Sequence, residues 1–181
     1  MLKMRYLFVL LIGLLISSAN LSAQDTEYAS ARQIGASIST LGGYGIHYIH
    51  PIDEKDNLKI IGIYIYDDSN GYKDSYFSLG GEYQRDLWES NVRRLYSLFG
   101  MHIDNQLSKD YYFDDYSYVG YNSSYNDTYF SIGGGIGMDL GERTKGVIVN
   151  AHLTYQFTRG MGDADHTRIG LGAGIGVGFN F

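Results

Sequence analysis

The 181-residue chain contains no cysteine and only one proline. Without cysteine there can be no disulfide framework and no lipid-modified cysteine, which excludes disulfide-stabilised secreted domains and lipid tethering. The single proline, Pro51, falls in a predicted turn. This is where proline belongs if every strand of a sheet is hydrogen-bonded on both sides.

Basic residues and long apolar runs are also scarce. The chain has 14 Lys and Arg against 20 Asp and Glu, and it lacks the basic stripe of a nucleic-acid-binding surface, so nucleic acid is excluded as a partner. Mean hydropathy is slightly negative, and no segment after residue 23 approaches a helical membrane span. This does not exclude a membrane, because alternating β-strands dilute their own apolar signal.

The amino terminus has the pattern of a secretory signal peptide. Lys3 and Arg5 precede an apolar run from Tyr6 to Ile16, and a small-residue site follows near Ser22-Ala23. The run is too short to span a bilayer as a helix. We therefore expect residues 1–23 to be removed, which leaves residues 24–181 as one domain with a net charge of about −8, from 12 basic and 20 acidic residues.

The clearest feature that is present is the alternation from Thr167 to Phe181. Apolar side chains and glycines occupy opposite faces, because side chains in a strand alternate with a period of two. The apolar face carries Ile169, Leu171, Ala173, Ile175, Val177, Phe179 and Phe181, and the other face carries Gly170, Gly172, Gly174, Gly176 and Gly178. Glycine weakens a strand exposed to water but suits the cramped inside of a barrel. The segment is therefore predicted to be a lipid-facing strand.

Eight alternating segments of this kind can be marked. They cover residues 32–41, 43–50, 58–66, 75–86, 95–105, 128–140, 147–157 and 167–181. Short turns alternate with longer polar connections, as in bacterial outer-membrane barrels with short periplasmic turns and longer outer loops. The fold class predicted is all-β, an eight-stranded antiparallel up-and-down transmembrane β-barrel in the outer membrane, with its lumen filled by side chains rather than open as a pore.

The interior is predicted from cross-strand pairing. Six polar residues are expected inside the barrel: Lys59, Glu82, Asn150, His152, Thr154 and Gln156. Lys59 should pair with Glu82, and Ile61 should lie opposite Gly80. If Gly141 pairs with Gly146, His152 lies opposite Gly135, and the next strand brings it near Gly174. Bulky side chains would thus face glycines, as a narrow lumen requires.

The segment Gln106–Asp127 is predicted to be a long outer loop and the best candidate for surface recognition. Tyrosine offers a large amphipathic contact area, and Ser and Asn offer adaptable hydrogen bonds. The candidate residues are Tyr111, Tyr112, Asp114, Asp115, Tyr116, Tyr118, Tyr121 and Tyr125. An ordinary solvated loop is the alternative, since loops tolerate this composition.

No catalytic, cofactor-binding or metal-ligating residue is assigned. The five histidines are spaced without a compact ligand set, and the glycine-rich stretches lack the Lys-Ser/Thr of a phosphate loop. One enzymatic alternative remains, because His152 and Thr154 resemble the His-x-Ser pair of outer-membrane lipid A deacylases, with Asp139 or Glu82 as the acid. Thr in place of Ser and the inward register weaken it. A soluble secreted calyx around a small apolar ligand is the other alternative.

Over residues 24–181 the chain resembles small eight-stranded outer-membrane barrels of the OmpA/OmpX type, grouped as porin-family or opacity-like proteins. Gly176, Phe179 and Phe181 match the glycine, apolar and aromatic positions of their carboxy-terminal insertion signal, and Gly174 departs from its polar position. The resemblance implies assembly by the outer-membrane insertion machinery and contact with outer-membrane lipids and lipopolysaccharide. A monomer with a structural or surface-interaction role is expected, and an extracellular ligand or host surface is the candidate partner. Gln24 after the cleavage site resembles Bacteroidetes-like secreted proteins.

Overall fold

The computed structural model describes residues 31–69, 72–114, 119–163 and 165–181. The predicted signal peptide, residues 1–23, lies outside these ranges. Eight strands make up almost all of the described chain: β1 (Gln33–Ser39), β2 (Gly43–Pro51), β3 (Asp56–Ser69), β4 (Tyr72–Glu89), β5 (Arg93–Asp114), β6 (Val119–Gly141), β7 (Gly146–Gly162) and β8 (Thr167–Asn180).

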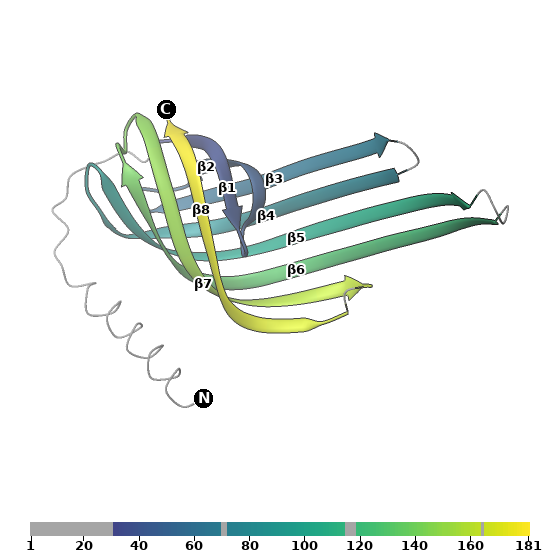
Figure 1. The fold of residues 1–181 in the computed structure, drawn as a ribbon. Helices are drawn as coiled ribbons and strands as arrows, with labels where there is room; N and C mark the ends of the chain where they lie inside the picture. The colour runs from purple at the N-terminus through teal and green to yellow at the C-terminus, as the bar shows by residue number, and fades with distance from the viewer. Residues whose placement is uncertain (1–30, 70–71, 115–118, 164) are drawn as a thin grey trace.

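The strands form one closed, antiparallel, up-and-down barrel. Each strand pairs with its neighbour in sequence, and β1 pairs with β8 from Gln33↔Asn180 to Ser39↔Gly174, which closes the ring. The predicted fold class is confirmed in its strand number, direction and order. Because the strand number is even, both barrel ends of the chain lie on one side, together with the turns after β2, β4 and β6 (Figure 1).

The wall of the barrel is uneven in height. β1 has seven residues and β2 nine, whereas β5 has 22 and β6 has 23. Figure 1 shows β3 to β6 continuing as a sheet far past the point where β1 and β2 end. The predicted loop Gln106–Asp127 is therefore wrong as a loop: all of it that the structure describes is paired β-ladder, up to Asp114↔Val119.

The error has a physical cause. The extension carries Tyr, Ser, Asn and Asp on both faces, so no apolar alternation marks it as strand. Strand formation there depends on backbone pairing with β4 and between β5 and β6, and on the strand preference of tyrosine.

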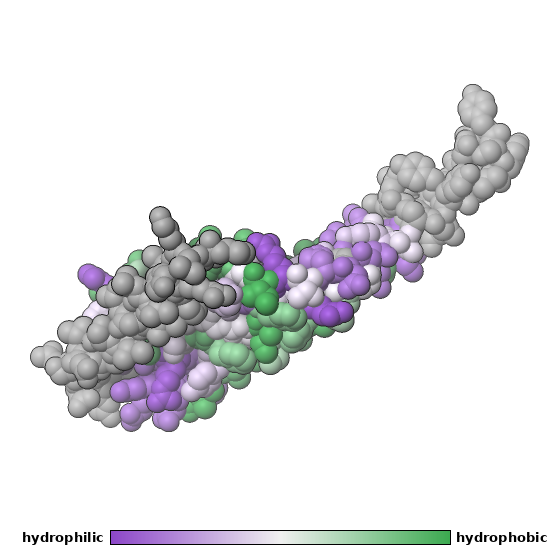
Figure 2. Space-filling model, turned by 90° about the horizontal axis from the view of Figure 1, so that it is seen from below, coloured by the Kyte–Doolittle hydropathy of each residue, from purple (hydrophilic) through white to green (hydrophobic). Residues whose placement is uncertain are grey.

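The two faces of the barrel differ in polarity as predicted. The outward face carries exposed apolar side chains around the ring, including Ile38, Ile46, Ile60, Leu79, Phe99, Met138, Leu153 and Ile175. Polar side chains from the same strands are buried in the lumen, including His47, Lys59, Glu82, Arg94, Asp139 and His152. In Figure 2, hydrophobic residues gather over the barrel wall, and hydrophilic residues occupy the extended sheet and the opposite end.

Two of the three predicted registers agree with the structure. Ile61 lies opposite Gly80 and Lys59 opposite Glu82, and His152 lies opposite Gly174. The β6–β7 register is wrong by two residues, since Gly141 pairs with Ile148 and His152 with Gly137. The reason lies in the turn. The amides of Gly141 and Arg143 donate to the backbone of the neighbouring turn, at Val92 and Asn91, instead of to β7.

Candidate functional site

The lumen is divided by the turn between β1 and β2, residues 40–42, which folds into the barrel. Leu41 is fully buried, and the backbone amide of Thr40 donates to the carbonyl of Ala173 at 3.1 Å. An added Cβ at Gly80 would meet the backbone of Gly42, so glycine is required where the turn approaches β4. The inserted turn separates a packed part of the lumen, on the side of the termini, from a cavity on the other side.

A charged cluster fills the end of the lumen near the termini. Arg94 is 2% exposed. Its Nε donates to Asp86 at 2.5 Å, and its Nη1 donates to Asp139 at 3.0 Å and to Gln84 at 2.9 Å. The guanidinium also lies 4.4 Å from the ring centroid of Tyr96. Two buried carboxylates thus share the Arg94 cation, and the arrangement closes the lumen at this level.

Arg143 extends the charged cluster to the mouth of the barrel. It comes from the β6–β7 turn, and its guanidinium lies 3.7 Å from Asp139, 3.8 Å from Asp86 and 3.4 Å from Glu89. Burial, followed by the nearby cation Arg94, lowers the pKa of Arg143. The turn itself is held by Asn180, whose Nδ2 donates to the carbonyl of Arg143 at 2.8 Å.

A second buried ion pair lies deeper in the lumen. Lys59 Nζ and Glu82 Oε2 are 3.7 Å apart, and both side chains are at most 1% exposed. Gln84 Nε2 donates to the same Glu82 oxygen at 3.0 Å and connects this pair to the charged cluster. Of the predicted interior residues, the structure therefore brings Lys59 and Glu82 together.

The other four predicted interior residues form one inward row on β7. Asn150, His152 and Thr154 are buried and Gln156 is half-buried. His152 Nε2 lies 2.8 Å from Ser39 Oγ, and Gln156 Nε2 donates to the carbonyl of Thr40 at 3.0 Å. The row thus tethers the inserted turn to β7.

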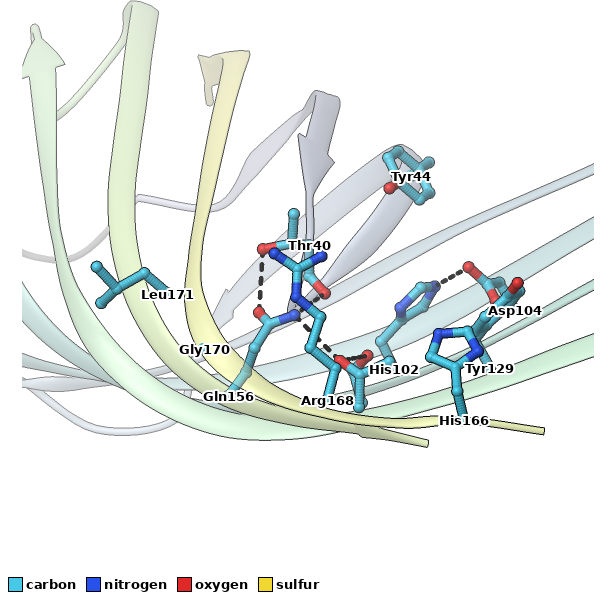
Figure 3. A pocket seen from close by; sticks show the side chains of 12 residues that line it. Thr40, Tyr44, His102, Asp104, Tyr129, Gln156, His166, Arg168, Gly170 and Leu171 are labelled. Atoms are coloured by element: carbon cyan, nitrogen blue, oxygen red, sulfur yellow. Dashed lines mark hydrogen bonds and ion pairs between the residues drawn. The ribbon is translucent and has the colours of Figure 1, made fainter. Parts of the chain in front are cut away.

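The upper cavity, on the far side of the inserted turn, has a volume of about 320 Å³. It is lined by Thr40, Tyr44, His102, Asp104, Tyr129, Ser131, Gln156, Thr158, His166, Arg168, Gly170 and Leu171. These residues come from the β1–β2 turn, from β2, β5, β6, β7 and β8, and from the segment before β8. Figure 3 shows Gln156 and Arg168 next to Thr40, and His102, Asp104, Tyr129 and His166 grouped on one side of them. This cavity is the candidate functional site.

Polar contacts within the upper cavity hold its floor and one wall. Thr40 Oγ1 donates to Gln156 Oε1 at 3.0 Å, and Gln156 Nε2 donates to Thr158 at 3.3 Å. On the opposite wall, His102 Nε2 lies 3.1 Å from Ser78 Oγ and 3.8 Å from Asp104 Oδ2. The Tyr129 and His166 rings meet edge to face, with centroids 5.7 Å apart.

Those of the predicted recognition residues that the structure describes lie on the extended sheet formed by β5 and β6, and none of them lines this cavity. Asp115, Tyr116 and Tyr118 lie outside the described residues. The backbones of four others are in the β5–β6 ladder: Tyr111, Tyr112, Asp114 and Tyr121. Tyr125 is exposed, and its hydroxyl donates to Asp127.

The described residues contain no group of three or more His, Asp or Glu placed to hold a metal ion. Nor does any helix in the described ranges have the length and apolar character to cross a membrane. For the enzymatic alternative, the contact of His152 Nε2 is with Ser39, while Thr154 Oγ1 donates to Gln156 at 3.2 Å.

Two features of the lumen are not predicted from the sequence. The marked segments end at residue 86 and begin again at residue 95, which leaves 87–94 as a predicted turn, whereas continued alternation back from Tyr96 places Arg94 inside. The inserted β1–β2 turn leaves a weaker signal. The paired glycines Gly42 and Gly43 mark a tight turn but do not show that it bends inward.

No family model matches the chain, and no curated protein matches it either. Similar solved structures include the N-terminal β-barrel domain of Pseudomonas aeruginosa OprF, with 18% identity over 83% of this chain and 95% of that one and a TM-score of 0.41. Ail, the attachment invasion locus protein of Yersinia pestis, has 14% identity over 83% and 97%, with a TM-score of 0.43. Acinetobacter baumannii CarO2 has 13% identity over 83% and 98%, with a TM-score of 0.35. Because these TM-scores are below 0.5, the architecture is inferred from the strand pairing of this chain and not from the similar structures.

Proposed function

We propose that the chain is an integral outer-membrane β-barrel protein with a closed lumen and a structural or surface-interaction role, without catalytic activity. The observation that supports this proposal is the reversal of ordinary polarity. Leu153, Ile175 and their equivalents on every strand are exposed on the outside, while Lys59 and Arg94 are fully enclosed. Such a wall would be costly in water and is stable against hydrocarbon. A soluble calyx requires the opposite arrangement.

The proposed orientation places the termini in the periplasm and the extended sheet outside the cell. Short turns join β2 to β3, β4 to β5 and β6 to β7 on the side of the termini, as in outer-membrane barrels. Partners in this setting are outer-membrane lipids and lipopolysaccharide, the insertion machinery during assembly, and an extracellular ligand or host surface. Closure of the ring leaves no unpaired strand within the wall, which favours a monomer. Assignment to a Bacteroidetes-like source stays a prediction.

Site-directed spin labelling tests the membrane placement. The chain has no cysteine, so a single cysteine can be labelled without background. In lipid vesicles, nitroxides at Leu153→Cys and Ile175→Cys should collide with oxygen dissolved in the bilayer and be shielded from a water-soluble nickel chelate. The matched inward position is Gly170→Cys, which should show the reverse. Water accessibility at both outward sites would contradict the proposal.

The non-catalytic role is tested on lipid A. The acylation pattern, measured by mass spectrometry, should be the same in cells with the gene, without it, and with His152→Ala. Loss of an acyl chain that depends on His152 would instead establish the lipid-modifying alternative.

The surface role is tested by shortening the β5–β6 hairpin. Residues 108–125 can be replaced by Asn-Gly, because Ser108 pairs with Tyr125 and a two-residue turn suits an antiparallel pair. Cells that produce the shortened protein should adhere less to cultured epithelial cells than cells producing the full chain at equal surface level. Equal adhesion would show that this hairpin has no such role.

A further inference from the structure

We propose that the upper cavity is a binding site for a neutral saccharide, a mono- or disaccharide unit, that enters from the side of the extended sheet. The inference goes beyond the proposed surface role, because it concerns the lumen and a small ligand. It depends on four properties of the cavity: access, hydrogen-bonding capacity, aromatic walls and charge.

Access follows from the uneven barrel wall. β1 ends at Ser39 and β2 begins at Gly43, while β3 to β6 continue upward. The cavity therefore opens above the low β1–β2 edge and is closed below by the inserted turn, where Thr40 is held by Gln156 and Ala173. A ligand can enter at this end of the barrel without passing the charged cluster. A volume of about 320 Å³ lies at the small end of the range of ligand pockets.

The lining has the hydrogen-bonding groups that hydroxyl-rich ligands require. Hydroxyls, an amide, two imidazoles, a carboxylate and a guanidinium line a common space, whereas the side chain of Leu171 belongs to the outward face, where it is 71% exposed. Together these groups offer both donors and acceptors, and sugar hydroxyls can pair with either. A pocket for an apolar ligand would instead be lined mainly by apolar side chains.

Three wall residues retain unused hydrogen-bonding capacity. Arg168 forms no ion pair within the described chain, and Figure 3 shows its side chain among the groups that surround the cavity. Asp104 Oδ1 has no hydrogen-bond partner among the described residues, although it is enclosed. His102, which is 4% exposed, also has an unpartnered Nδ1. Enclosed polar atoms without partners are rare in native structures, and a ligand hydroxyl is one way to satisfy them.

Aromatic rings stand on two sides of the cavity. Tyr44 packs edge to face on His102, with centroids 6.0 Å apart, and Tyr129 packs likewise on His166. These contacts fix the rings in place. The faces of such rings carry negative partial charge and attract the polarised C–H groups of a sugar ring.

Charge favours a neutral ligand over an anion. The cation of Arg168 is balanced by the carboxylate of Asp104 in the same lining. Asp127 lies close by, since it accepts from the hydroxyl of Tyr129 at 3.2 Å. A phosphate or carboxylate in this cavity would therefore share it with the carboxylate of Asp104, whereas a neutral polyol adds no negative charge.

Glycine provides a matched pair of variants for the test. Gly170 lines the cavity, and a Cβ added there has only Arg168 Nε within 4 Å, at 3.9 Å. Gly170→Leu should therefore fill the cavity without disturbing the barrel. Gly81 faces outward, and its added Cβ has only the Lys59 carbonyl oxygen within 4 Å, at 3.8 Å. Gly81→Leu makes the same change outside the lumen and is the control.

Binding is measured on the purified full-length barrel in an amine-oxide detergent, because sugar-based detergents would compete. The probes are glucose, galactose, mannose, N-acetylglucosamine and maltose. Their binding is detected by saturation-transfer NMR and quantified by isothermal titration calorimetry. At least one should bind the unmodified protein. Gly170→Leu and Arg168→Gln should each weaken that binding at least tenfold, and Gly81→Leu should leave it unchanged. Heat-modifiable gel mobility verifies that each variant is folded.

The proposal is overturned if none of the five sugars binds, or if Gly170→Leu binds them with unchanged affinity. Inorganic phosphate is tested in parallel. Binding of phosphate without any sugar, dependent on Arg168, would make the cavity an anion site and would also overturn the proposal. Because the measurement is made in micelles, its outcome does not depend on where the protein resides in the cell.

Discussion

The two halves of the lumen follow the same alternation of side chains but differ in how they are filled. Near the termini, glycines face large polar groups: an added Cβ at Gly137 would collide with Tyr96, and one at Gly174 with His152. In the upper cavity, Gly170 faces open space. Glycine therefore makes room in both halves, and what occupies that room depends on the neighbouring strands.

The difference arises from strand length and from one turn. In the packed half all eight strands contribute side chains, and the charged cluster is enclosed by the ring. In the upper half β1 and β2 contribute little, because β1 ends at Ser39, β2 begins at Gly43, and the turn between them bends inward at Leu41. Closed packing therefore depends on a complete ring, and the cavity exists where the ring is incomplete.

The largest expected effect comes from removing the cation of the charged cluster. Arg94→Ala leaves Asp86 and Asp139 buried with one cation fewer, so the free energy of unfolding should fall by about 3–5 kcal/mol. Urea unfolding in lipid vesicles measures this. Arg93→Ala, on the exposed side of the same strand, is the control. A loss equal to that of the control would show that the packed half does not depend on this ion-pair network.

A somewhat smaller effect is expected at the inserted turn. Leu41→Ala removes a fully buried side chain that packs with Tyr96 and Leu98. Such truncations cost about 2–5 kcal/mol, and the lower part of this range is expected because the turn borders the open cavity and can relax. The same unfolding assay applies, with outward Leu153→Ala as the control. An unchanged stability would indicate that the turn does not insert.

Overpacking of the inner glycine row should have a moderate effect. Gly174→Leu places its side chain against His152 and Ser39, which should cost about 1–3 kcal/mol. Gly135→Leu should also be unfavourable. There the contact is with the backbone of Leu153 and Thr154 rather than with His152, because of the β6–β7 register. Heat-modifiable gel mobility and urea midpoints report both. Normal folding of both variants would refute the inner-face assignment.

The smallest expected effect is on the extended sheet. Replacement of residues 108–125 by Asn-Gly removes pairing beyond the barrel wall, so barrel stability should stay within about 0.5 kcal/mol of the full chain. A large loss would mean that the extension supports the barrel and would remove the contrast between wall and extension.

Much of the fold could be predicted, since it depends on local alternation. The β3–β4 pairing around Lys59 and Glu82 follows from a short connection and from the need to keep apolar side chains on one face. The cavity residues could not be assembled in the same way. Tyr44, His102 and Arg168 are far apart in sequence and meet only because the ring closes. The predicted β6–β7 register is wrong because the backbone amides of Gly141 and Arg143 donate hydrogen bonds to the turn between β4 and β5.

The sequence by itself determined which side chains face outward and which face inward, because that depends only on a period of two along each strand. It also determined the number of strands and their antiparallel order, since most of the connections between consecutive alternating segments are short. Tertiary structure decided the inward fold of residues 40–42, the enclosure of Arg94 and the shape of the upper cavity. These depend on contacts between strands distant in sequence, which exist once β1 pairs with β8.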